Sequence, residues 1–228
     1  MSLDLLPDPT AAAVLRRLHE ASERQDPRLR LHYLPRIPAM LTGRAFSLAP
    51  FDGFYKDKYL AMTPAQAAFV YSLISASRAR CIVEFGSSLG VSTIWLALAA
   101  RANWGKVITT EIVPEKAAQT RANLEEAGLA DVVDIRVGDA SQTLRDLDEP
   151  VDFLLSDGFP TKALDVLQLV HPLLVPGATV VTNNVATFSA NYRPYLAWLR
   201  DPTHGYVSTT VPFKSGTEVS VYGGPVEH

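Results

Sequence analysis

The sequence predicts an α/β fold in which helices cover both faces of a mostly parallel sheet. Short apolar segments, typical of strands buried on both faces, occur at residues 81–85, 107–110, 153–155 and 178–181. Helix-forming segments separate them, and this alternation is typical of parallel strands with right-handed crossovers. Near the end of the chain, Lys214-Ser215-Gly216 joins residues 206–213 to 217–222 as in a hairpin. The last strand is therefore expected to run antiparallel to its neighbour.

The first predicted helix covers residues 9–24, where Ala12, Val14, Leu15 and Leu18 fall on one face. Prolines at positions 27, 35, 38 and 50 then interrupt the chain. Residues 1–60 are therefore expected to form a helical arm and a proline-rich segment, and residues 61–228 the main domain. Because a sheet domain offers the apolar face of the arm no obvious partner, we expect it to pack across a two-fold homodimer.

The main domain is expected to begin with a helix. Thr63-Pro64-Ala65-Gln66 has the pattern of a capping box with proline at the first helical position, which predicts a helix up to about Ser77. Further helices are predicted at residues 91–102, 114–129 and 164–174. Residues 133–137 alternate between apolar and polar side chains, which predicts a strand at the edge of the sheet. This strand brings the predicted number to seven.

Composition limits the classes of function. The 228 residues are 47% hydrophobic and 20% charged, which is typical of a globular protein. A net charge of −3 argues against a nucleic acid or a membrane surface as partner. The longest apolar run, 94–100, is far shorter than the ~18 residues of a membrane span. Asp4 and Asp8 make the first ten residues unlike a secretion signal, and the single cysteine, Cys81, excludes an internal disulfide. We expect a cytoplasmic protein.

The segment from Val83 to Ser92 contains the strongest candidate for a binding site. It ends a predicted buried strand and opens a helix, and glycines there allow a ligand to approach the backbone. Glu111 ends the next strand, where a carboxylate can accept both hydroxyls of a ribose. Two simpler interpretations stay open. The glycines suit a tight turn, and Glu111 suits the N-terminus of the helix that begins near Pro114.

The loop does not have the spacing of a dinucleotide site. A G-x-G-x-x-G loop binds pyrophosphate through its amides, whereas Ser88 interrupts that pattern here and no basic residue lies in the loop. We therefore expect a nucleoside ligand without phosphate groups.

These residues resemble the class I S-adenosylmethionine-dependent methyltransferases, and more closely the small cation-dependent O-methyltransferases of the catechol and caffeoyl-CoA type. The similarity includes the stretches Glu84-Phe85-Gly86, Gly90-Val91-Ser92, Glu111, Gly138-Asp139-Ala140, Ser156-Asp157-Gly158-Phe159, Asn183-Asn184 and residues 211–218. The resemblance implies a Rossmann-like methyltransferase sheet with an antiparallel last strand. It also implies transfer of a methyl group from S-adenosylmethionine to a hydroxyl group of a small molecule.

The resemblance also implies roles for individual residues. It implies that the cofactor is bound by Thr63, Glu84, Gly86, Ser87, Gly90, Ser92, Glu111, Asp139, Ala140 and Asp157. Asp157 is implied to be catalytic as well. Where Mg²⁺ or another divalent cation binds, weakly, the implied ligands are Asp157, Asn183 and Asn184. Asp139 also suits a turn, and the two asparagines also suit a polar strand end.

The sequence departs from this family at two positions. Asn183 stands where the family usually has an aspartate, and Pro160 where it has a lysine, with Lys162 as the nearest substitute. Because the affinity of a site for Mg²⁺ depends on its charged ligands, the first change is expected to weaken a metal site. A nicotinamide-dependent oxidoreductase and a cofactor-binding protein without catalysis remain the alternatives.

Two other groups of residues have less specific interpretations. Aromatic and basic residues before the main domain suit either a lid over the methyl acceptor or ordinary packing of the arm: Phe51, Phe54, Tyr55, Lys56, Lys58 and Tyr59. His171 lies in an apolar helix and is expected to pack in the core rather than to act as a base. The sequence does not identify the methyl acceptor.

Overall fold

The computed structural model describes residues 3, 6–42, 44–45, 58, 60–213 and 215–226, with the side chains of residues 26–30 and 40–41 excepted. The aromatic residues that suit either a lid or packing of the arm lie outside the described residues, as does Lys56: Phe51, Phe54, Tyr55 and Tyr59. Lys58 is described and is buried.

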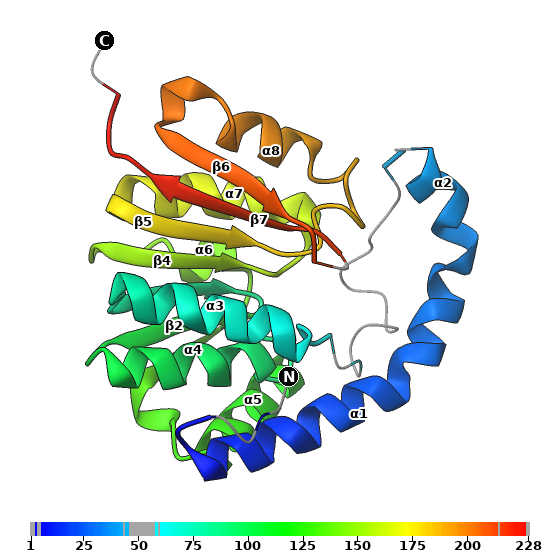
Figure 1. Cartoon of the computed structure of the whole chain (residues 1–228), viewed down its shortest axis with the longest axis vertical. Coiled ribbons are helices and arrows are strands. Elements are labelled where there is room, and N and C mark those ends of the chain that lie inside the picture. The colour runs from blue at the N-terminus through cyan, green and yellow to red at the C-terminus, as the bar shows by residue number, and fades with distance from the viewer. Residues whose placement is uncertain are drawn as a thin grey trace.

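The fold is built on one seven-stranded sheet (Figure 1). Its strands are β1 Cys81–Phe85, β2 Lys106–Glu111, β3 Val133–Val137, β4 Val151–Ser156, β5 Leu174–Thr182, β6 Tyr206–Val211 and β7 Thr217–Tyr222. They lie in the order β3-β2-β1-β4-β5-β7-β6, and β1 to β5 pair in parallel. The last strand, β7, is antiparallel to β5 and to β6. This topology confirms the predicted fold class, including the edge position of residues 133–137.

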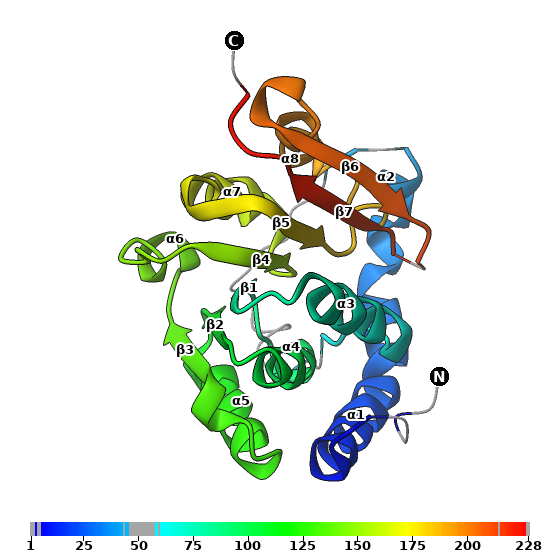
Figure 2. The same ribbon diagram turned by 60° about the vertical axis from the view of Figure 1, so that its left-hand side comes forward.

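Helices cover both faces of the sheet, as Figure 2 shows. The α-helices are α1 Pro9–Tyr33, α2 Ile37–Leu41, α3 Pro64–Ser77, α4 Val91–Ala102, α5 Pro114–Glu126, α6 Ala140–Thr143, α7 Ala163–Val170 and α8 Arg193–Leu199. Short 3₁₀ helices occur at Leu34–Arg36, Ala130–Val132, Pro160–Lys162, His171–Leu173 and Pro202–His204. One face is covered by α3, α4 and α5, with α1 outside them, and the other by α6, α7 and α8.

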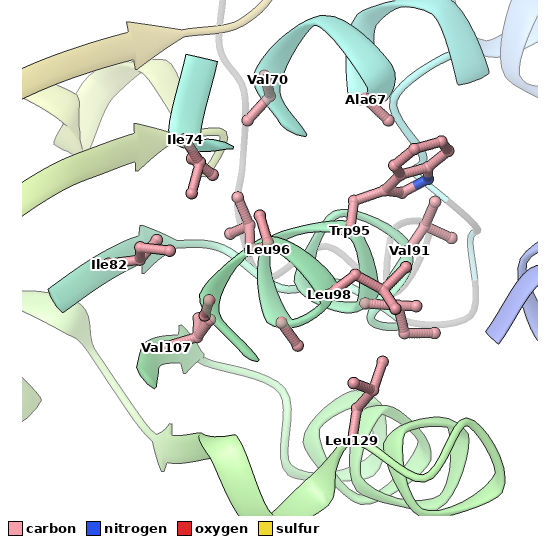
Figure 3. Close-up of a cluster of buried hydrophobic side chains, with 14 of the residues drawn as sticks. Ala67, Val70, Ile74, Ile82, Val91, Trp95, Leu96, Leu98, Val107 and Leu129 are labelled. Carbon is pink, nitrogen blue, oxygen red and sulfur yellow. The ribbon is translucent and has the colours of Figure 1, made fainter. Parts of the chain in front are cut away.

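The larger core lies between β1, β2 and the helices α3 and α4 (Figure 3). All residues from 91 to 100 of α4 are buried, because α3, the sheet and α1 surround this helix. Residues 94 to 100 of this helix are all apolar, as expected where a helix is buried on all sides. The core therefore fixes the start of α4, and with it the glycine loop that precedes it.

The N-terminal helix differs from the prediction in two ways. It continues through Pro27 to Tyr33, because the following arginines and leucines favour a helix and one proline removes only one backbone hydrogen bond. Its apolar face, with Leu15 and Leu18 fully buried, packs within this chain against α4 and α5. The expectation that this face has no partner in the domain was therefore wrong.

His171 is half-buried in a 3₁₀ helix and packs against aromatic residues, rather than packing in the core from an apolar helix as expected. Its Nδ1 atom lies 2.6 Å from the hydroxyl of Tyr206, and its ring packs edge-on against Trp198 and Tyr222. Burial lowers its pKa. Among the described helices, none is long and apolar enough to cross a membrane.

Candidate functional site

A cavity of about 940 Å³ lies at the carboxyl ends of β1, β2, β4 and β5. Its size falls in the upper part of the range for ligand sites, ~300–1,000 Å³. Eight of the residues predicted from the sequence line it: Thr63, Gly86, Glu111, Asp139, Ala140, Asp157, Asn183 and Asn184. The structure thus brings together residues that lie far apart in the sequence.

The arm contributes to the wall of this cavity. Figure 1 shows α1 and α2 curving along the side of the molecule toward which the parallel strands point. His19, Ser22, Glu23 and Tyr33 of α1 line the cavity. The Nε2 atom of His19 is buried and has no hydrogen-bond partner among the described residues, and burial lowers the pKa of this histidine. It is a polar group that the sequence analysis did not select, because no nearby residue marks it.

The floor of the cavity is formed where the loop after β1 meets the loop after β4. Gly86 has φ +92°, and a Cβ atom there would lie only 2.8 Å from the Cα atom of Gly158. Glycine at position 86 is therefore required both by its backbone conformation and by this close contact. The contact holds Glu111 and Asp157, on either side of β1, against one cavity.

Three backbone amides of the glycine loop, those of Gly86, Ser87 and Ser88, already donate within the chain. The N–H groups of Gly86 and Ser87 both donate to the carbonyl oxygen of Thr110, at 3.2 and 3.0 Å. The N–H group of Ser88 donates to the Glu111 carboxylate at 2.8 Å. A pyrophosphate would have to displace these bonds, so the geometry favours a ligand without phosphate groups.

Glu111 has the free capacity that a ribose would need. Each of its carboxylate oxygens accepts one backbone N–H, from Ser88 at 2.8 Å and from Val113 at 2.9 Å. Each oxygen keeps a second lone pair, because a carboxylate accepts about four hydrogen bonds. Burial raises the pKa of Glu111, while the amides and the charge of Lys116 oppose this shift. The free acceptor capacity of Glu111 therefore fits two vicinal hydroxyls, which would donate to it.

Asp139 begins α6 as its N-cap residue. Its Oδ1 atom accepts hydrogen bonds from the N–H and the hydroxyl of Ser141, at 2.9 and 2.8 Å, and these bonds lower the pKa of the aspartate. The turn interpretation of Asp139 is thus realised, and its Oδ2 atom is not used by these bonds. Ala140 follows it at the cavity wall.

Asp157 follows β4 and lies against the cavity. Burial raises its pKa to about 7, the side chain of Asn183 opposes the shift, and the nearby Glu84 adds to it. Its oxygens face two amides, with Asn183 Nδ2 at 3.5 Å and Asn184 Nδ2 at 3.3 Å. Both distances are at the long end for hydrogen bonds. The carboxyl group is therefore held loosely and is close to its titration point at neutral pH.

Gln66 and Thr217 were missed as site residues, although the capping box that contains Gln66 was predicted. The capping box is confirmed, with the Thr63 hydroxyl accepting from the Gln66 N–H at 3.3 Å. The Gln66 Nε2 atom donates to Asn183 Oδ1 at 3.0 Å, and the Thr217 hydroxyl donates to the same oxygen at 2.9 Å. Only the fold reveals this link, because 117 residues separate Gln66 from Asn183.

Four of the predicted residues lie behind the cavity wall rather than in it: Glu84, Ser87, Gly90 and Ser92. Glu84 is fully buried, and its Oε2 atom accepts hydrogen bonds from the hydroxyls of Thr93 and Thr109 at 2.6 and 2.5 Å. Burial raises its pKa. Glu84 therefore connects β1 to α4 and β2 and supports the loop from behind.

The residues predicted to hold a cation do not form a favourable ligand set. Within the described part of the chain, no group of three or more histidine, cysteine, aspartate or glutamate side chains is arranged to hold a metal ion. Asp157 is accompanied by amide nitrogens, which are hydrogen-bond donors and not ligands. Lys162, the substitute for the missing lysine, lines the cavity and forms an exposed ion pair with Asp165.

Part of this chain is similar in sequence to known methyltransferases. Residues 83–185 match a family model described as a methyltransferase domain. The chain is 37% identical over 127 residues to a catechol O-methyltransferase of Mycobacterium tuberculosis, a match that covers 55% of this chain and 57% of that protein. The chain therefore matches less than two thirds of the length of this curated relative.

Two solved structures extend the similarity to most of the fold. An O-methyltransferase from Bacillus cereus in complex with SAH is 25% identical, with a TM-score of 0.65, and the match covers 77% of this chain and 93% of that one. TomG from Streptomyces achromogenes, an O-methyltransferase in complex with SAM, is 26% identical, with a TM-score of 0.63 and coverage of 72% and 82%. These similarities confirm the resemblance to the class I S-adenosylmethionine-dependent methyltransferases. Within that class they confirm the likeness to the small O-methyltransferases.

Proposed function

We propose that this chain transfers the methyl group of S-adenosylmethionine to an oxygen atom of a small molecule. The observation that carries the proposal is the position of Glu111 and Asp157, which face one cavity across the contact between Gly86 and Gly158. The N–H groups of Gly86, Ser87 and Ser88 donate within the chain, which disfavours the nicotinamide alternative.

The proposed cofactor site follows the edge of the sheet. Glu111 would accept the two ribose hydroxyls, and Asp139 and Ala140 would lie beside the adenine. Gly86, Thr63 and Asp157 would bind the methionine end, with Asp157 next to its ammonium group. Glu84, Ser87, Gly90 and Ser92 would act from behind the wall, by holding the loop and the start of α4 in place.

S-adenosylmethionine supplies an electrophilic methyl group on a positively charged sulfur atom. The chain would contribute mainly by positioning, because in-line alignment at near-attack distance is a large part of the rate. The acceptor hydroxyl must also lose a proton. The raised pKa of Asp157, about 7, suits a group that takes up this proton at neutral pH.

The proposal is tested first by binding. Isothermal titration calorimetry with S-adenosylmethionine, S-adenosylhomocysteine and NAD is expected to give binding of the first two only. Mass spectrometry of the ligand that copurifies with the protein provides an independent measurement. Binding of NAD alone would overturn the proposal.

A screen of acceptors tests the reaction itself. The relative named catechol O-methyltransferase makes catechol the first acceptor to try, followed by other small phenols and alcohols. A product heavier by one methylene group is expected for at least one acceptor. Cofactor binding without any product, over a broad set of hydroxyl compounds, would favour a binding protein without catalysis.

We further propose a homodimer that forms through the outer end of the arm. Leu31, Leu34 and Ile37 are exposed there, with exposed fractions of 68%, 53% and 40%. Large exposed apolar side chains that lie together often mark an interface. Light scattering is expected to give the mass of a dimer, and Leu31→Ser is expected to shift it to that of a monomer. Val207→Ser, at another exposed apolar position, is the matched control. The cytoplasmic location stays a prediction.

A further inference from the structure

A chain of side-chain hydrogen bonds leads from the start of α3 to Asp157. The Gln66 Oε1 atom accepts hydrogen bonds from the backbone N–H of Thr63 at 3.2 Å and from the Thr63 hydroxyl at 2.8 Å. The Gln66 Nε2 atom donates to Asn183 Oδ1, and Asn183 Nδ2 faces Asp157. Gln66, Asn183 and Thr217 are all nearly inaccessible to solvent.

The orientation of the two amides in this series of hydrogen bonds is fixed by the first donor, the N–H of Thr63. A backbone N–H can only donate, so the Gln66 atom that faces Thr63 must be the oxygen. The amide nitrogen of Gln66 then faces Asn183 and can only donate, so the Asn183 atom that it meets must be Oδ1. The amide nitrogen of Asn183 is therefore the atom that faces Asp157. The donors and acceptors around Asn183 thus determine the orientation of its amide.

A divalent cation does not fit this orientation. The Asn183 oxygen is occupied by the donors Gln66 and Thr217 and points away from Asp157. Turning the amide to offer its oxygen to a cation would break the two hydrogen bonds that Asn183 Oδ1 accepts and place the Asn183 amide nitrogen against that of Gln66. The Gln66 nitrogen would then keep only its longer hydrogen bonds to the hydroxyls of Ser215 and Thr217, at 3.3 and 3.4 Å. Asp157 then remains as the only carboxylate of the three predicted ligands, and Mg²⁺ affinity depends on ligand charge.

We propose that this site works without a divalent cation, and that the amide nitrogen of Asn183, oriented by Gln66 and Thr217, is the partner of Asp157 instead. Asn184 supplies a second amide to the other carboxylate oxygen, at 3.3 Å. Gln66, Thr217 and Asn183 are thus positioning residues, which act on the cavity through Asp157. The inference concerns the same cavity as the proposed methyl transfer and rests on that function for its role in catalysis.

Isothermal titration calorimetry of the wild-type protein with MnCl₂ and with MgCl₂ tests the proposal directly. We expect no binding tighter than about 1 mM, the weak end of natural oxygen-ligand sites. The same titration with S-adenosylhomocysteine present is expected to give the same result. Binding of Mn²⁺ below this limit that Asp157→Asn abolishes would overturn the proposal.

Asn183→Asp tests whether the amide at position 183 is what keeps a divalent cation from binding. This variant restores a second carboxylate at the position where the family usually has one, and we expect Mn²⁺ affinity to rise at least about tenfold. Circular dichroism and binding of S-adenosylhomocysteine check that the variant is folded. A folded variant with no gain in affinity would overturn the role assigned to Asn183.

Gln66→Glu tests the orientation without changing any predicted ligand. A carboxylate at position 66 still accepts from the Thr63 N–H but no longer donates to Asn183, so the Asn183 amide is expected to turn its oxygen toward Asp157. Mn²⁺ affinity should then rise, whereas Gln119→Glu, which adds the same charge at an exposed position of α5, should leave it unchanged. An equal response of the two variants would reduce the effect to charge and overturn the positioning role.

These measurements separate the inference from the proposed function. If S-adenosylhomocysteine fails to bind, the proposed function fails, while the Mn²⁺ titrations still decide whether the site takes a cation. If the cofactor binds and methyl transfer is unchanged by a chelator, both stand. Methyl transfer that a chelator abolishes and Mn²⁺ restores would overturn the inference and leave the proposed function intact.

Discussion

The two carboxylates that face the cavity are held in different ways. Glu111, at the end of β2, is fixed by two backbone N–H groups at 2.8 and 2.9 Å. Asp157, after β4, is held by two side-chain amides at 3.3 and 3.5 Å. Backbone donors move only with the fold, whereas side-chain donors depend on which residue stands at each position.

This difference separates binding from chemistry. A carboxylate that strong backbone hydrogen bonds hold in one place suits a ligand that must be bound the same way in every cycle. A carboxylate with weak partners and a pKa of about 7 can gain and lose a proton with little rearrangement. We therefore expect Glu111 to act on affinity, and Asp157, which would also contact the ammonium group of the cofactor, to act more strongly on the rate than on affinity. The variants below test this division.

The largest effect is expected for Asp157→Asn, which removes the group that takes up the acceptor's proton. The rate of methyl transfer with the best acceptor should fall roughly 10²–10⁴-fold, as for the loss of a general base. The dissociation constant of S-adenosylhomocysteine should change much less than the rate. Asp148→Asn, at an exposed position between α6 and β4, is the matched control. Equal losses in rate and in affinity would contradict the division of roles.

Glu111→Ala is expected to act on affinity. Loss of two hydrogen bonds to a charged group should weaken the binding of S-adenosylmethionine by about 1.5–3 kcal/mol, or roughly 10- to 150-fold in the dissociation constant. Calorimetry measures this change, and the exposed Glu125→Ala on the same side of the sheet provides the control. Unchanged affinity would show that Glu111 only begins the next helix.

The sequence predicted the first of these carboxylates better than the second. The glycine loop and Glu111 lie close to strand ends that their own apolar patterns reveal, so the edge of the sheet where the cavity lies followed from local signals. The seven strands, the edge position of β3 and the antiparallel β7 were predicted for the same reason. A periodic pattern records which face of an element is buried, and burial dictates most of a parallel sheet.

The surroundings of Asp157 were not predictable in this way. Gln66 was recognised as part of a capping box, but its second contact, with Asn183, depends on how α3 packs beside β5 and β7. The predicted partner of the arm was wrong for a related reason. The apolar face of α1 packs against α4, which lies more than 70 residues later in the chain. Local pattern identifies an apolar face or a polar side chain, but it does not identify what the fold brings against it.

The pH dependence of the free energy of unfolding should isolate the contribution of Asp157. The carboxyl of Asp157 titrates near pH 7 in the folded protein and near its ordinary pKa of 3.8 when unfolded. Between these values the folded state holds a proton that the unfolded state releases, so the free energy of unfolding falls as the pH rises from about 4 to 7. We expect a loss on the order of 2 kcal/mol, since water in the cavity reduces the full effect.

Urea denaturation of the wild type and of Asp157→Asn at several pH values measures this contribution. The variant should lack that part of the pH dependence. Burial raises the pKa of Glu111 too, in the same direction, but Glu111 is present in both proteins and cancels in the difference. Parallel curves for the two proteins would mean that Asp157 is already ionised in the folded state below neutral pH.

The smallest effect concerns the contact that joins the two halves of the site. Gly86 and Gly128 both have positive φ angles, +92° and +66°, but a Cβ atom would meet Gly158 at 2.8 Å in the first case and nothing within 4 Å in the second. Alanine should cost about 1 kcal/mol at either position because of the backbone conformation, and about 1 kcal/mol more at position 86 because the loops after β1 and β4 must separate. Urea denaturation measures both costs, and calorimetry with S-adenosylhomocysteine shows whether the separation reaches the site. Gly86→Ala should weaken binding while Gly128→Ala leaves it unchanged, because only Gly86 lies between the carboxylates. Equal stability losses with unchanged binding in both variants would mean that the two halves of the site hold their positions independently of each other.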